Sequence, residues 1–146
     1  MFDKLEAINI ICDQPRDNVV ETIKAVDLTV ECRIIHHVIG YCLIPKSGTR
    51  EQVTELELYL IWAIWVNRPL DWTNIIFQNL GKGIKRKDGN CPYGITLTSL
   101  FNYLNVDLSN EEGFALVSGD FYNTNTMNFM GFYLDDNTQT WRKKKD

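Results

Sequence analysis

The sequence lacks an apolar run long enough to cross a lipid bilayer. Its longest such run, residues 58–66, is far shorter than the roughly 20 residues that a transmembrane helix needs. No charged leader followed by an apolar segment begins at Met1, which argues against a secretory signal. We therefore expect an intracellular protein, cytoplasmic or nuclear, that does not bind membranes.

Cysteine and histidine are scarce and form no pattern typical of a zinc site. The two histidines are adjacent, and no Cys-X-X-Cys pair occurs. The wide spacing of the four cysteines favours free, mostly buried thiols in a reducing compartment: they are Cys12, Cys32, Cys42 and Cys91. Cys32 and His36 share a helix face and Cys42 lies nearby, which is the arrangement that most resembles a set of metal ligands. A thiol- or metal-dependent enzyme is therefore kept as a third hypothesis, weaker than the two functions proposed below.

Signatures of catalysis are also missing. A Gly-X-Ser-X-Gly elbow does not occur. The glycine-rich stretch at 81–83 lacks the spacing and the Ser or Thr of a P-loop. The sequence therefore predicts a non-enzymatic protein with no catalytic residue, no metal ligand and no cofactor.

The residues that are present predict a packed, helical protein. The chain has 146 residues, of which 45% are hydrophobic and 23% are charged, a balance typical of one globular domain. We expect a mainly α, single-domain bundle of about five to six helices with a small C-terminal β-hairpin. Residues 1–28 are predicted to form an N-terminal helical extension packed on the main domain, which covers 29–146.

Capping residues and apolar spacing predict where the helices begin. The expected segments are a short helix from Asp17 or Asn18 to about Val26, a buried helix over 30–43, a central helix after the Thr54–Glu57 capping box, an amphipathic helix capped by Asp71, and a helix after Pro92 with Leu97, Leu100, Phe101 and Leu104 on one face. A second capping box, Ser109 with Glu112, predicts a further short helix. Residues 130–134 and 138–142 predict the hairpin.

Positive charge is concentrated in two places, although the net charge is −4. The first cluster follows the Asp71 helix and the second ends the chain. The candidate nucleic-acid contacts are Lys82, Lys85, Arg86 and Lys87 in the first cluster and Trp141, Arg142, Lys143, Lys144 and Lys145 in the second. Lysine and arginine would contact phosphates, and Trp141 would stack on a base. The plainer interpretations are that the first cluster complements the negative end of a helix dipole and that the second is a solubilising tail. Either cluster is also a candidate nuclear-import signal.

Several phrases resemble the domain of plant retrotransposon-derived open reading frames, described as plant transposon proteins. The matching phrases are Ile35-His-His-Val-Ile39, residues 43–48 leading to Val53-Thr54, Pro92-Tyr-Gly through Phe101, and Thr126 through Phe132 with Trp141 and its trailing lysines. The resemblance covers about residues 30–145, and the sequence departs from it at 67–71. It implies no enzyme activity and assigns no functional residue.

These observations favour a non-enzymatic, transposon-derived module that binds other proteins and is a candidate for self-association. Trp and Tyr dominate interface energetics, so the anchor candidates are Trp62, Trp65, Trp72, Trp141, Tyr93 and Tyr103. The alternative is a nucleic-acid-binding protein of a retroelement that uses the two basic clusters.

Overall fold

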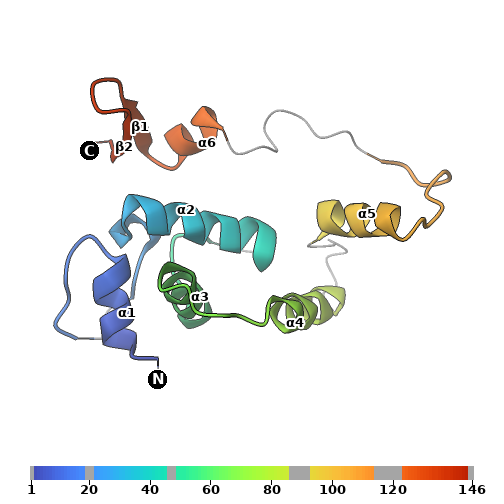
Figure 1. The fold of residues 1–146 in the computed structure, drawn as a ribbon, viewed down its shortest axis with the longest axis horizontal. Coiled ribbons are helices and arrows are strands. Elements are labelled where there is room, and N and C mark those ends of the chain that lie inside the picture. Colours follow the sequence, from blue (N-terminus) through green and yellow to red (C-terminus); the bar gives the residue numbers. More distant parts are fainter. Residues whose placement is uncertain (1, 19–21, 46–48, 86–92, 114–122, 145–146) are drawn as a thin grey trace. The chain divides into compact units, whose positions relative to one another are not determined.

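The computed structural model describes residues 2–18, 22–45, 49–85, 93–113 and 123–144 (Figure 1). Within these ranges it has six α-helices and one two-stranded antiparallel sheet, which confirms the predicted mainly helical fold with a C-terminal hairpin. The chain divides into two compact units, residues 1–100 and 101–146. Sequence analysis did not predict this division, and the boundary that it placed at residue 28 stays a prediction.

The first helix, α1 (Lys4–Ile11), lies in the segment predicted as a helical extension, although no helix was predicted at these residues. The Asp3 side chain caps it by accepting the backbone N–H groups of Leu5 and Glu6 at 2.9 and 3.0 Å. Its buried residues, Ala7, Ile8 and Ile11, lie on one face and belong to the core of the first unit. The N-terminal residues therefore contribute to the core directly.

The prediction of a helix from Asp17 or Asn18 to about Val26 is wrong for the residues of this segment that the structure describes. Residues 22–24 are not helical, and only a short 3₁₀ turn follows, η1 (Ala25–Asp27). The reason is a distant pairing that local signals do not reveal: Lys24 bridges Gln52, and the Ala25 N–H donates to the Glu51 carbonyl at 2.7 Å. Residues 19–21 lie outside the described residues.

The central helix α3 (Glu55–Trp65) begins at the predicted capping box. The Thr54 N–H and hydroxyl donate to the Glu57 carboxylate at 2.8 and 2.7 Å, and the Glu57 N–H donates back to the hydroxyl at 3.3 Å. Most of the helix is buried, as its apolar sequence predicts: Glu57, Leu58, Leu60, Ile61, Trp62 and Ala63. Helices α1 and α2 both pack against it (Figure 1).

The predicted buried helix over 30–43 is present in two parts. It begins as α2 (Val30–Val38), capped by Thr29, and continues without a break as the π-helix η2 (Ile39–Leu43). Cys32, His36 and Ile39 face the core. The wider π turn changes which side chains face inward, and it leaves Tyr41 and Cys42 exposed.

Helix α3 ends in a Schellman motif that leads to the next helix. Asn67 adopts a left-handed conformation, with φ 53°. The Asn67 N–H donates to the Ile64 carbonyl at 3.1 Å and the Arg68 N–H to the Ala63 carbonyl at 2.7 Å. The predicted amphipathic helix follows as α4 (Trp72–Ile84), where the Asp71 carboxylate accepts the Asn74 N–H at 2.9 Å. Both the start and the type of this helix are confirmed.

Helix α5 (Gly94–Tyr103) confirms the helix predicted after Pro92. The further helix predicted from the Ser109–Glu112 box does not begin there: residues 109–111 form a turn, and the Asp107 carboxylate accepts the Ser109 N–H at 2.9 Å. The rest of that segment, 114–122, lies outside the described residues.

The second unit contains a short helix and the hairpin. Helix α6 (Thr124–Phe129) is capped by the Asn123 side chain, in a segment that sequence analysis left unassigned. The predicted hairpin is confirmed, with β1 (Phe132–Asp135) antiparallel to β2 (Thr140–Lys143) and Leu134 opposite Trp141. Phe132, which is fully buried, is the apolar centre between α6 and the hairpin.

Candidate functional site

The first basic cluster lies at the end of α4. Lys82 is in its last turn and Lys85 is its C-cap, and both side chains are exposed. This placement suits the negative end of the helix dipole. Arg86 and Lys87 lie outside the described residues.

The second basic cluster is engaged with the hairpin itself. The Arg142 Nε is 2.9 Å from the Asp135 carboxylate, and the Lys144 ammonium donates to the Asn128 carbonyl at 3.2 Å. Trp141 and Lys143 are half-buried. Lys145 lies outside the described residues. Two cations of this cluster therefore already have partners in their own unit, and the two clusters belong to different units.

The residues of the metal or thiol hypothesis differ in their exposure. Cys32 is buried, Cys42 is exposed, and His36 faces α3, where its Nε2 lies 3.5 Å from a Glu57 carboxylate oxygen. Burial raises the pKa of the Cys32 thiol. Among the described residues, no group of three or more histidine, cysteine or acidic side chains is arranged to hold a metal ion. Sequence analysis missed the partner of His36 because Glu57 lies on another helix.

A stacked cluster lies beside this pair at the start of the π-helix. The His37 ring stacks on Tyr41 with 4.0 Å between centroids, and the Arg50 guanidinium lies 3.9 Å from the centroid of the same ring. Burial, and then the charge of Arg50, lowers the pKa of His37. At neutral pH His37 is therefore a neutral stacking partner. No sequence pattern predicted this contact, because Arg50 approaches from the segment before α3.

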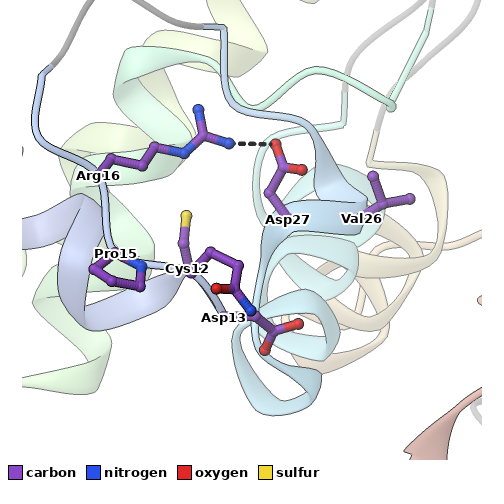
Figure 2. A pocket seen from close by; sticks show the side chains of 7 residues that line it. Cys12, Asp13, Pro15, Arg16, Val26 and Asp27 are labelled. Carbon is purple, nitrogen blue, oxygen red and sulfur yellow. Dashed lines mark hydrogen bonds and ion pairs between the residues drawn. The ribbon is translucent and has the colours of Figure 1, made fainter.

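A pocket of about 410 Å³ lies between α1 and η1, around the Cys12 thiol. Figure 2 shows the Cys12 sulfur directed toward an ion pair in which the Arg16 guanidinium is 2.8 Å from the Asp27 carboxylate. Burial raises the pKa of Cys12, although Arg16 opposes the shift. The thiol is therefore protonated at neutral pH and is a weak nucleophile.

Helix α5 exposes large apolar side chains at its end and just after it. Its last turn closes in a Schellman motif, in which the Asn105 N–H donates to the Asn102 carbonyl at 3.2 Å and the Val106 N–H to the Phe101 carbonyl at 2.9 Å. This turn brings Val106 back to the side of the helix that carries Phe101. The resulting apolar face, which we call the α5 strip, consists of Leu97, Leu100, Phe101, Leu104 and Val106.

The α5 strip is largely open to solvent. Leu100 is 46% exposed and Leu104 is 58% exposed, and the neighbouring Tyr103 is 81% exposed. Sequence analysis predicted the shared face of this helix but not its exposure. Of the other anchor candidates, Trp62 and Tyr93 are buried in the first unit, whereas Trp65 is 46% exposed.

The base of α5 is fixed to the first unit by one tyrosine. The Tyr93 hydroxyl donates to the Leu43 carbonyl and accepts from the Asn79 amide, each at 2.8 Å. Tyr93 is buried, and this burial raises the pKa of its phenol. The tyrosine of the Pro-Tyr-Gly phrase therefore has a structural role that joins η2, α4 and the start of α5.

Comparison with protein-family models, with curated proteins and with solved structures found no match. The resemblance to plant retrotransposon-derived proteins therefore stays a prediction. Within the described ranges, no helix combines the length and the apolar character that crossing a bilayer requires.

Proposed function

We propose that this chain is a non-enzymatic, transposon-derived module that binds other proteins through the α5 strip. The observation that carries the proposal is a row of large apolar side chains on one helix face, of which Leu100, Phe101, Leu104 and Val106 are all exposed. Contiguous exposed apolar surface is typical of protein interaction sites.

The energetics favour a protein partner for this surface. Burying one large apolar side chain contributes about 1.5–3 kcal/mol, so covering the strip with the apolar surface of another protein is favourable. Tyr103, which lies beside the strip, adds an aromatic anchor of the kind that dominates interface energies. A nucleic acid carries a charged phosphate backbone, and the strip, which is aliphatic apart from Phe101, has no charged group to contact it.

The basic clusters give less support to nucleic-acid binding. Arg142 and Lys144 contact acceptors within their own unit, and a phosphate would have to compete with those acceptors. The chain as a whole carries a net charge of −4, which opposes non-specific attraction to a polyanion. Protein binding is therefore the function that the site supports best.

The test is affinity purification from plant cells with two matched variants. Leu104→Asp places a charge on the strip, and Asn102→Asp places the same charge in the same last turn on the opposite face of the helix. We expect Leu104→Asp to lose the bound proteins at least tenfold and Asn102→Asp to retain them, with or without nuclease. Loss of all partners on nuclease treatment would instead favour nucleic-acid binding, and equal recovery with both variants would reject the strip.

A further inference from the structure

We propose that the partner of the α5 strip presents an amphipathic helix whose apolar face is bordered by lysine and arginine side chains. This inference rests on the proposed function, because it names the class of partner that the same surface would bind. It is carried by the negative charge of the segment that follows the strip and by the shape of the strip itself.

The sequence around the strip contains no positive charge. All fifteen Lys and Arg residues, and both histidines, lie outside the stretch between Lys87 and Arg142. The same stretch contains seven acidic residues, Asp88, Asp107, Glu111, Glu112, Asp120, Asp135 and Asp136. An acidic partner would therefore be repelled by this part of the chain, whereas a basic partner would be attracted to it.

Asp107 lies directly at the end of the strip. The Val106 N–H donates to the Phe101 carbonyl at 2.9 Å, so the chain folds back against the last turn of α5 just before it reaches Asp107. The Asp107 carboxylate accepts the Ser109 N–H at 2.9 Å. Hydrogen bonds from Ser109 lower the pKa of Asp107. This exposed carboxylate is therefore ionised at neutral pH.

Two more carboxylates follow close behind along the chain, on Glu111 and Glu112. The Glu111 N–H donates to the Leu108 carbonyl at 3.0 Å, which closes a turn, and both glutamate side chains are exposed. These acidic residues and the part of the strip from Phe101 onward belong to the same compact unit. The strip therefore ends in an acidic group that local hydrogen bonds position.

The shape of the strip favours a helix as its partner. The residues from Leu97 to Leu104 recur at spacings of three and four, and they form a ridge about 10 Å long at about 1.5 Å per residue. Such a ridge packs into the groove of another helix, and amphipathic helices are recognised through apolar residues at this spacing. Apolar contact supplies the attraction, while the carboxylates select which apolar helix binds.

The experiment measures the binding of three synthetic helical peptides to the full chain by fluorescence anisotropy. The peptides share a leucine face and a length of about 18 residues, or about five turns. They differ only in the residue that borders this face, which is lysine, glutamate or glutamine. We expect the lysine peptide to bind about tenfold more tightly than the glutamine peptide, and the glutamate peptide to bind most weakly. The preference should shrink at about 1 M salt, where the Debye length is only about 3 Å.

Charge reversal shows which carboxylates set this preference. Glu111→Lys combined with Glu112→Lys should remove the preference for lysine. Glu51→Lys combined with Glu55→Lys changes the net charge by the same amount in the first unit and should keep it. All four side chains are exposed, and circular dichroism would verify that helix content is unchanged. An equal loss in both double variants would assign the preference to net charge and overturn the proposal.

The apolar contact is tested separately with two neutral variants. Leu104→Gln removes an apolar side chain without changing the charge, and it should weaken binding of the lysine peptide at least fivefold, whereas Asn102→Gln should not. If the three peptides bind equally well and Leu104→Gln weakens them all, the strip still binds apolar helices and only the basic partner class fails. If Leu104→Gln binds the lysine peptide as the wild type does, the proposed function fails as well. If no peptide binds, the inference of a basic helix fails, and the affinity purification above decides the proposed function by itself.

Discussion

Helices α3 and α5 are both rich in apolar residues, yet they bury them to very different extents. In α3 the residues from Glu57 to Ala63 are nearly all buried, because α1 and α2 pack against that helix. In α5 the apolar face is exposed from Leu100 onward. Apolar spacing therefore shows which side of a helix avoids water but not what covers it.

The two helices also differ in how polar groups fix them. In α3 the buried Glu57 makes two polar contacts, because its carboxylate accepts the Thr54 N–H at the start of the helix and faces His36 on α2. Among the contacts described above, only those of the Tyr93 hydroxyl hold the start of α5 against the first unit. We interpret α3 as the structural centre of the first unit and α5 as a surface element held for contact.

The largest effect is expected from removing Glu57, which tests whether α3 is the structural centre of the first unit. Glu57→Ala deletes the carboxylate half of the capping box of α3 and leaves His36 buried without its carboxylate, so we expect a loss of about 3 kcal/mol in the free energy of unfolding. Urea denaturation would measure it. Glu55→Ala, on the exposed side of the same turn, should cost less than about 1 kcal/mol, and similar losses for both would contradict the central role of Glu57.

The next largest effect on stability is expected at Asn67, the residue with a left-handed conformation at the end of α3. Asn67→Val forces a β-branched residue into a positive φ and should cost about 1–2 kcal/mol, whereas Asn67→Gly should be neutral or slightly stabilising because glycine adopts this conformation freely. Thermal unfolding of the two variants would measure the difference. Equal midpoints would show that the Schellman motif does not limit stability.

Tyr93 tests whether the base of α5 is held as described. Tyr93→Phe removes the hydroxyl between the Leu43 carbonyl and the Asn79 amide, and it should cost about 1–2 kcal/mol. Hydrogen exchange should rise in the first turn of α5 while α3 remains protected. Unchanged exchange in α5 would mean that the helix is anchored by other contacts.

The smallest expected effect concerns pH. The pKa of His37 is lowered from 6.5 in the folded chain, so the unfolded chain binds more protons between the lowered and the ordinary value. Stability should therefore fall as pH drops below about 6.5. His37→Gln should flatten that part of the stability curve, and an unaltered slope would assign the pH dependence to other groups.

Local signals predicted the elements that depend on neighbours in the chain. The Thr54–Glu57 box and the Asp71 cap are contacts over three residues, and both are present. The helix after Asp17 was wrong because Ala25 pairs with Glu51, a contact between segments distant in the sequence. Sequence alone gives no such pairing.

The candidate site was predictable only in part, for the same reason. The shared face of Leu97, Leu100, Phe101 and Leu104 follows from helical spacing. Its exposure, the Schellman turn at Asn105 and the contact of His36 with Glu57 depend on how the chain folds in space. The basic residues were predicted as charged groups, but the engagement of Arg142 with Asp135 was not.

The most direct test of the account is a photo-crosslinking amino acid at Phe101, on the α5 strip, compared with the same group at Phe77 on α4. Phe77 is more exposed, at 72% against 38%, so exposure alone would favour the control. We predict that position 101 cross-links to another polypeptide and that position 77 does not. Cross-links that are as strong from 77, or absent from 101, would contradict it.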